Sequence, residues 1–428
     1  MYLPCNELKW VVMSMDGNNC KHRERRLKMI SVGIDVSKGK STVCCMRDYG
    51  EIIAGPMDIS HVDTEMRVFA KMLGGFREEV RVVMEATGIY HLPIMSYLLG
   101  RGFFVSVINP YQMKQYRTEG QGLRKVKTDK ADSMLIAKYG IDHWASLKKK
   151  SKTDDAYEEL SVLSKQYRHY MRVHVESLLE LTHILDYTMP GLKEHLNSWN
   201  PDSGKDKLAD FVMQYWHYEN ITKRSEKQFI ESYLKWAQRK GYHQSQEKAA
   251  KIYSMAKEGI PTLPATQTTK MLVIQAVDVL KRVDETLVMI LARMREIAKT
   301  LPEYDTVRSM GGVGNVLAPR LIADIGDVRR FHSGKALIAY AGIDVPPYES
   351  GKFHGSNRSI LKRGSASLRK TGYEVMRVLT SHAVPEDKAV YEFIKKKESE
   401  GKAKKVAKIA GLNKFLRIYY ARVMEVYS

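Results

Sequence analysis

The sequence predicts an α/β domain near its start and a longer, mostly α-helical remainder. Short β-rich runs alternate with helical patterns over residues 31 to 150. Beyond them, apolar residues recur at three- and four-residue steps, which is the period of an α-helix. We therefore divide the chain into a basic extension (1–30), an α/β domain (31–150), a coiled-coil linker with a helical insertion (151–302) and a helical C-terminal domain (303–428).

The composition indicates a globular protein with a polyanionic partner. The 428 residues are 44% hydrophobic, which is enough to bury cores for several domains. The formal net charge is +20, and lysine and arginine gain most where they displace counterions from phosphates. No apolar run approaches the ~18 residues that a membrane-spanning helix needs. Nucleic acid is the expected partner, with no membrane.

The first thirty residues show no secretory signal, because the apolar patch Trp10–Met13 is short and the basic cluster Lys21–Lys28 follows it. This extension is either a nucleic-acid-binding arm or lies upstream of a true start at Met29. The four cysteines form no CxxC pair, which predicts neither a zinc site nor disulfides and favours a reducing cytosol. They are Cys5, Cys20, Cys44 and Cys45.

The α/β domain begins with three strands that predict an antiparallel meander. These strands are Ser31–Lys38, Thr42–Arg47 and Glu51–Met57. A helix (Val62–Leu73), a strand (Val80–Met84), a helix (Tyr90–Leu99), a strand (Phe103–Ile108) and a helix from Asp129 follow. This order predicts an RNase H-like fold in which the first strand is central.

Four carboxylates fall at informative places in these elements. Asp35 lies in the middle of the first strand and Glu85 ends the fourth. Asp129 and Asp132 follow Thr128, a predicted N-cap, and their spacing puts both on one helix face. Singly, each has an ordinary structural explanation, such as a strand-end charge or a helix-dipole partner. Together they predict a site for divalent cations, Mg²⁺ or Mn²⁺, because clustered carboxylates otherwise repel one another.

A basic loop precedes the acidic pair and could hold a phosphodiester over the metals. Its cations are Lys114, Arg117, Arg124, Lys125 and Lys127. The alternative interpretation is a solvated basic loop.

The middle of the chain predicts two long helices. The first spans residues 154 to 188, and the second shows a heptad seam from Val273 to Leu301. The seam pairs either within the chain or with a second protomer, and a homo-oligomer, dimer or tetramer, is expected. Residues 190 to 265 between them predict a small helical insertion whose Trp199, Trp216 and Trp236 favour core positions.

The C-terminal domain is the most basic part, with 23 Lys and Arg against 13 Asp and Glu over residues 303 to 428. The glycine turn Ser309–Asn315 indicates either a helix-hairpin-helix-like phosphate contact or a simple tight turn. An acid-free run from Gly351 to Lys370 follows Ser350. It carries Lys352, Arg358, Lys362, Arg363, Arg369 and Lys370.

Several of these stretches resemble one family. Gly33–Lys38, Met84–Gly88, Val107–Pro110 and Lys127–Asp132 are similar to the RuvC-like half of the DEDD transposases of the insertion-sequence one-ten family, to which Piv-type DNA invertases are related. Ser309–Phe331, Ala339–Gly342, Tyr348–Gly351 and Lys362–Gly364 resemble the C-terminal domain of that family. Two features depart from the family pattern: Gly311 replaces a usual proline, and the insertion is long.

The resemblance implies a transposase or site-specific recombinase with a RuvC-like catalytic domain. It implies that Asp35, Glu85, Asp129 and Asp132 bind divalent metal and that Ser350 joins covalently to DNA. It also implies a structured non-coding guide RNA that pairs with donor and target DNA. The alternatives are a RuvC-like nuclease, in which the four acids activate water, and a non-catalytic nucleic-acid-binding scaffold.

Overall fold

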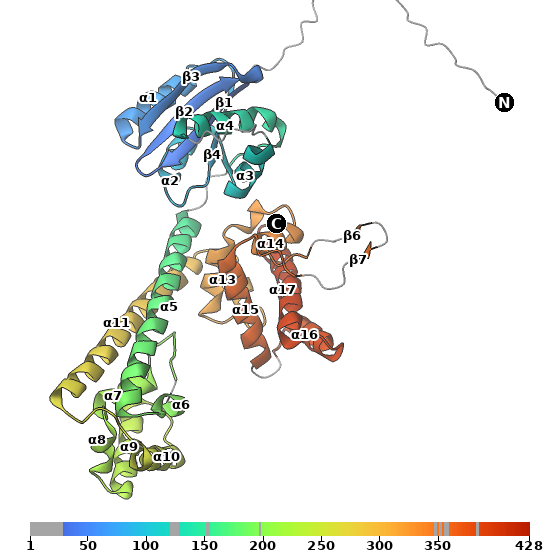
Figure 1. Cartoon of the computed structure of the whole chain (residues 1–428). Coiled ribbons are helices and arrows are strands. Elements are labelled where there is room, and N and C mark those ends of the chain that lie inside the picture. Colours follow the sequence, from blue (N-terminus) through green and yellow to red (C-terminus); the bar gives the residue numbers. More distant parts are fainter. Residues whose placement is uncertain are drawn as a thin grey trace, which may run out of the picture. The chain divides into compact units, whose positions relative to one another are not determined.

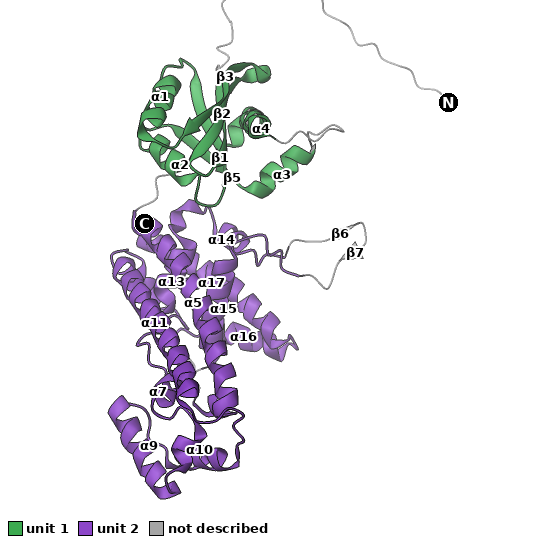
Figure 2. Cartoon of the chain, turned by 60° about the vertical axis from the view of Figure 1, so that its left-hand side comes forward, with its two compact units in different colours: residues 1–152 green, residues 153–428 purple. Residues whose placement is uncertain are grey.

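The computed structural model of the chain describes residues 29–119, 128–150, 155–196, 198–345, 349–350, 353–354, 359–381 and 385–428. The chain divides into two compact units, residues 1–152 and 153–428 (Figure 2). Each unit has hydrophobic core of its own. In the described part of the chain, no helix is both long enough and apolar enough to span a bilayer.

The first unit is built on a mixed five-stranded sheet. Its strands are β1 (Met29–Ser37), β2 (Lys40–Arg47), β3 (Ile52–Ser60), β4 (Glu79–Glu85) and β5 (Phe104–Ile108). They lie in the order β3-β2-β1-β4-β5, so β1 is central. The strands β1, β2 and β3 form the predicted antiparallel meander, and β4 lies parallel to both β1 and β5.

Alternation along β1 gives the sheet two different faces. Ile30, Val32, Ile34 and Val36 belong to a core with helices α1 (Asp63–Gly74) and α2 (Leu92–Leu99). By the same alternation, Gly33 and Asp35 belong to the other face. Helix α4 (Asp129–Asp142) packs on β1 at that face (Figure 1). The remaining elements of this unit are α3 (Pro110–Glu119) and the short 3₁₀ turns η1 (Asp48–Gly50) and η2 (Trp144–Ser146).

Two long antiparallel helices run through the second unit: α5 (Asp155–Thr188) and α11 (Gln267–Ala298). The predicted seam residues Val273, Leu280 and Leu287 are completely buried. They belong to cores that also contain residues of α5, such as Leu181 and Tyr167. Of the two alternatives for the seam, the structure shows pairing within the chain.

The insertion between these helices is helical, as predicted. It contains α6 (Leu192–Leu196), α7 (Lys207–Gln214), α8 (Tyr218–Thr222), α9 (Glu226–Lys240) and α10 (Gln246–Glu258). Trp236 is buried in its core, and Trp216 packs against the same core. Trp199 packs against the core of the C-terminal helices instead. The three tryptophans therefore serve packing, as their sequence context predicts.

Residues 303–428 are mostly helical, again as predicted. The helices are α12 (Tyr304–Arg308), α13 (Leu317–Ile325), α14 (Gly334–Ala341), α15 (Ala366–Ser381), α16 (Ala389–Ser399) and α17 (Lys404–Val426). A 3₁₀ turn, η3 (Val328–Arg330), and two short strands, β6 (Glu349–Ser350) and β7 (Phe353–His354), complete the set. The glycine turn lies between α12 and α13, where Gly312 has a φ of 80°. These helices share one core with α5 and α11.

Candidate active site

Asp35 and Glu85 lie at the same end of the sheet in the first unit. The parallel register of β1 and β4 pairs Ile34 with Met84, so the next residue on each strand is a carboxylate. Glu85 is the last residue of β4. The carboxyl ends of parallel strands commonly carry the binding or catalytic groups of α/β proteins.

The first turn of α4 brings the other two carboxylates to this end. The Thr128 hydroxyl accepts a hydrogen bond from the Ala131 amide at 3.1 Å, which confirms the predicted N-cap. Asp129 and Asp132 lie in that first turn. The helix packs closely because residue 33 is glycine: a Cβ there would lie 2.2 Å from the Ser133 carbonyl oxygen.

The electrostatics of Asp35 link all four carboxylates. Its pKa is raised to about 6, first by burial and then by the negative charges of Asp132, Asp129 and Glu85. The positive charge of Arg117 acts in the opposite direction. The structure therefore gathers the four predicted acids around one half-buried strand position.

Arg117 contacts a predicted metal ligand. Its guanidinium forms an ion pair with Asp132 at 3.1 Å, and its Nε is buried without a hydrogen-bond partner among the described residues. Lys114, on the same helix α3, is exposed. The other predicted cations of this loop, Arg124, Lys125 and Lys127, lie outside the described residues.

The four acids fit a divalent cation by donor type and by charge. Carboxylate oxygens are the ligands that Mg²⁺ and Mn²⁺ prefer, and a cation would relieve the repulsion that raises the pKa of Asp35. They do not fit by distance in their present side-chain positions: within the described part of the chain, no three Asp, Glu, His or Cys side chains are grouped closely enough to hold one ion.

A fifth acid, Asp58, shares a row of cross-strand neighbours with Asp35 and was not predicted from the sequence. Thr42 on β2 pairs with Asp35 on β1 and with Asp58 on β3. The Thr42 hydroxyl donates to Asp58 at 2.7 Å, and Lys40 pairs with Asp58 at 3.1 Å. These partners lower the pKa of Asp58, so it stays ionised where the pKa of Asp35 is raised. Only the strand register reveals this row.

The predicted nucleophile Ser350 belongs to the second unit. It lies on β6, where its backbone is opposite Phe353 of β7. The two chain segments that flank this hairpin are joined by backbone hydrogen bonds. The Lys362 amide donates to the Gly342 carbonyl at 3.0 Å, and the Ser365 amide donates to the Tyr340 backbone carbonyl at 2.6 Å. These two bonds join the described segments that precede and follow the hairpin in the sequence.

The predicted cations of this region have different environments. Arg369 donates from one guanidinium nitrogen to the Ala341 carbonyl at 2.9 Å and the Gly364 carbonyl at 3.1 Å, which joins the same two segments. Lys362, Arg363 and Lys370 are exposed. Lys352 and Arg358 lie outside the described residues.

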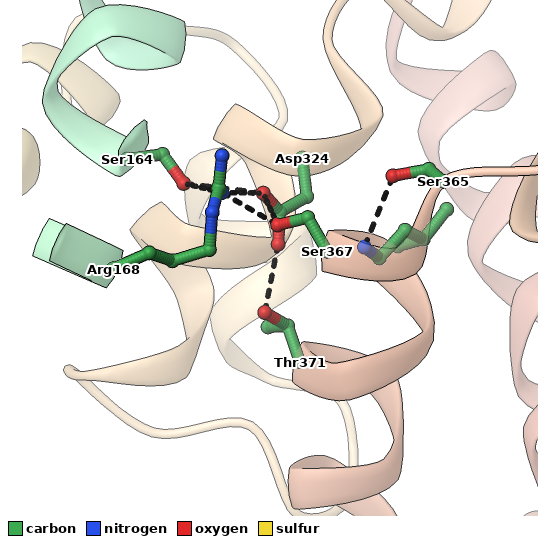
Figure 3. A network of polar contacts seen from close by, with 7 residues as sticks. Ser164, Arg168, Asp324, Ser365, Ser367 and Thr371 are labelled. Carbon is green, nitrogen blue, oxygen red and sulfur yellow. Dashed lines mark hydrogen bonds and ion pairs between the residues drawn. The ribbon is translucent and has the colours of Figure 1, made fainter. Parts of the chain in front are cut away.

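A polar network around the buried Asp324 includes Ser367, two residues after Ser365 (Figure 3). The Asp324 carboxylate on α13 accepts hydrogen bonds from the hydroxyls of Ser367 at 2.5 Å, Thr371 at 2.7 Å and Ser164 at 3.1 Å. Arg168 on α5 pairs with the same carboxylate at 2.9 Å. The network ties α5, α13 and the start of α15 together. It was not predicted from the sequence, because Ser164 is 160 residues and Ser367 is 43 residues from Asp324.

Comparison with known proteins places the chain among transposases and DNA-inverting proteins. A family model described as "Transposase" matches residues 32–190, and one described as "Transposase IS116/IS110/IS902 family" matches residues 304–392. A pilin gene-inverting protein of Moraxella bovis is 22% identical over 92% of this chain and 95% of its own length. The pilin gene-inverting protein of Moraxella lacunata is 22% identical over 81% of this chain and 80% of its own.

A third relative covers less of the chain. A transposase for insertion sequence element IS1111A of Coxiella burnetii is 30% identical over 21% of this chain and 24% of its own length. The α/β sheet, the basic helical unit and these likenesses define a DNA-recombining enzyme. The chain belongs to the IS110 family of transposases, which is the family predicted from the sequence motifs.

Proposed function

We propose that this transposase cuts and rejoins DNA through a covalent phosphoserine intermediate at Ser350, with a divalent cation held by Asp35, Glu85, Asp129 and Asp132. The observation that carries the proposal is the gathering of four carboxylates at one end of a central sheet, in a chain of this family. We also propose that this sheet domain is RuvC-like. Mg²⁺ or Mn²⁺, when bound there, would stabilise negative charge on the phosphate and lower the cost of deprotonating the attacking group.

The chemistry of Ser350 balances without an outside energy source. Its oxygen forms a bond to phosphorus and loses its proton, while the bond from phosphorus to one deoxyribose oxygen breaks and that oxygen gains a proton. The phosphodiester energy stays in the phosphoserine bond, so a new DNA hydroxyl can reverse the step without ATP. Gly351 follows Ser350 in the sequence, and a glycine allows close backbone approach. The exposed Lys362 and Arg363 favour a bound phosphate.

The partners belong to the same proposal. Donor and target DNA would be selected by a structured non-coding guide RNA, and a dimer or tetramer of the protein would hold the exchanging strands. Because Ser350 and the carboxylates belong to different compact units, a site composed from two protomers is compatible with this proposal. We place the protein in a reducing cytoplasm, in line with the free thiols of Cys44 and Cys45 on β2.

The test is a denaturing gel that detects DNA covalently linked to protein. With guide RNA, DNA and Mg²⁺ supplied, the wild type should give a linked band that Ser350→Ala lacks, and Asp35→Asn should lack it while still binding DNA. Tyr348→Phe is the control for the neighbouring hydroxyl. A band that persists in Ser350→Ala but is lost in Tyr348→Phe would move the nucleophile.

The same gel separates the alternatives. Metal-dependent cutting without any linked band in the wild type favours a RuvC-like nuclease that uses water. No cutting at all under conditions in which the DNA is bound favours a non-catalytic scaffold.

A further inference from the structure

The turn between α16 and α17 carries an unusual concentration of positive charge. Residues 395 to 408, here called the hairpin tip, contain seven lysines and two glutamates. The two helices pack against each other (Figure 1). The match to the C-terminal family model ends at residue 392, so the hairpin tip lies beyond it.

Six of the seven lysines of the hairpin tip fall into two groups; the seventh is Lys396. Lys395 pairs with Glu398 at 3.0 Å, and Lys397 pairs with Glu400 at 2.6 Å. The second group comprises Lys402, Lys404, Lys405 and Lys408. Within the described part of the chain, the side chains of Lys404, Lys405 and Lys408 form no ion pair or hydrogen bond, and Lys404 and Lys405 are exposed.

The charge of Lys402 acts on Glu400, whose carboxylate already pairs with Lys397. The pKa of Glu400 is lowered first by its hydrogen bond from Lys397, with smaller contributions from the charges of Lys396 and Lys402. One glutamate therefore faces three lysines. Among the residues that the structure describes, no further carboxylate pairs with these lysines.

The position of these lysines on α17 adds to the imbalance. The first turn of a helix carries partial positive charge, so acids are favourable there and cations are not. The first turn of α17 contains no acid and no side-chain cap, and Lys404 and Lys405 begin the helix. Lys408 follows Lys404 at the four-residue spacing at which like charges destabilise a helix. This surface is thus arranged for an external anion.

We propose that Lys402, Lys404, Lys405 and Lys408 bind the phosphate backbone of duplex DNA without reading its sequence. A chain of phosphates suits several cations spread over a helix turn, and the family acts on DNA. A membrane surface suits them less, because only Val406 provides an exposed large apolar side chain within the hairpin tip. The proposal rests on the chain's being a DNA-recombining enzyme and is independent of Ser350.

The experiment compares two double variants that remove the same charge from the same hairpin tip. Lys404→Gln/Lys405→Gln removes unpaired lysines, and Lys395→Gln/Lys397→Gln removes paired ones. DNA binding is measured by fluorescence anisotropy at several salt concentrations, in an Asp35→Asn background without Mg²⁺. The probes are two duplexes of unrelated sequence, an RNA hairpin and anionic phospholipid vesicles.

Lys404→Gln/Lys405→Gln should reduce the slope of log affinity against log salt by about 2, since each phosphate contact contributes about 0.9. The reduction should be equal for both duplexes. Lys395→Gln/Lys397→Gln should change the slope by less than about half as much. The melting temperature of Lys404→Gln/Lys405→Gln should equal or exceed that of the wild type, because repulsion at the helix start is removed.

Three results would overturn the proposal. Equal slope changes in the two double variants would mean that only net charge matters. Unchanged DNA slopes in both would mean that the hairpin tip does not contact DNA. A loss confined to the RNA hairpin or to the vesicles would assign the surface to that partner instead. Because cleavage is absent from this assay, failure of the Ser350 proposal would not alter any of these readings.

Discussion

At the residue scale, Asp35 shows how a strand position becomes chemically special. Its neighbours Ile34 and Val36 are buried on the apolar face, so alternation directs Asp35 to the face that α4 covers. There its burial, and after it the negative charges of Asp132, Asp129 and Glu85, make ionisation of its side chain costly. The cost is a stability penalty in the absence of a cation.

Asp35→Asn should therefore stabilise the metal-free protein above pH 6. The pKa of Asp35 is about 6 in the folded protein and 3.8 in the unfolded chain, so folding is favoured while the group is protonated. Its contribution is fully present below pH 3.8 and is lost as the pH rises through 6. At pH 8 the variant should gain about 1 kcal/mol, after allowance for solvent screening of a half-buried group.

The measurement is urea unfolding with a chelator at pH 5, 6 and 8, and Asp48→Asn on η1 is the control. The gain should grow with pH in Asp35→Asn and stay flat in the control. Added Mg²⁺ should stabilise the wild type more than Asp35→Asn. A pH-independent difference would show that the pKa of Asp35 is not raised in the folded protein.

Asp324 has a structural role that a test of stability can isolate. Asp324→Ala removes the acceptor for three hydroxyls and one guanidinium in a buried site, so the free energy of unfolding should fall by about 3 kcal/mol. Asp305→Ala, at an exposed position in the first turn of α12, should cost less than about 1 kcal/mol. Chemical denaturation of both variants checks the difference, and equal losses would contradict the importance of the network.

At the element scale, α11 shows why a heptad pattern leaves its partner undefined. Val273, Leu280 and Leu287 recur as in any coiled coil, and the same seam would suit a second protomer. The chain itself supplies α5 as the partner. The pair is further specified by a buried hydrogen bond of 2.6 Å between His174 and Asp284, one from each helix.

Leu287→Ala should consequently destabilise the fold and leave the mass of any assembly unchanged. Leu287 is completely buried, so the lost contacts and the cavity should cost about 3 kcal/mol. Met289→Ala on the same helix is the control, because Met289 is 64% exposed and its loss should cost less than about 0.5 kcal/mol. Urea unfolding and light scattering measure the two effects. A lower assembly mass for Leu287→Ala would indicate a seam shared between protomers.

At the scale of the whole molecule, the hydrophobic cores determine which fragments of the chain can fold on their own. The core of the sheet lies entirely within residues 29–152. The C-terminal helices instead share one core with α5 and α11, through residues such as Tyr157, Leu291, Leu321 and Phe415. The hydrogen bond from Tyr157 to the buried Glu303, at 2.6 Å, reinforces this shared packing.

Residues 29–152 expressed alone, and residues 153–428 expressed alone, should each unfold cooperatively. Residues 303–428 alone should not, because removal of α5 and α11 exposes one side of their core. Circular dichroism melting of the three fragments is the measurement. A sharp transition for residues 303–428 would show that the C-terminal helices form an independent domain.

The sequence by itself determined the element types and the family. Alternation along residues 31 to 57 predicts the meander, helical periodicity predicts α5 and α11, and motifs around Asp35 and Ser350 identify the transposase family. These features depend on neighbours along the chain, so local patterns are sufficient to show them.

Only the tertiary structure decided which distant side chains meet. The intrachain partner of the seam, the ion pair of Arg117 with Asp132, the row that joins Asp58 to Asp35 and the network at Asp324 each depend on strand register or helix packing. No pattern along the chain encodes these pairings, because each contact joins elements that are separated in sequence and come together only when the cores form.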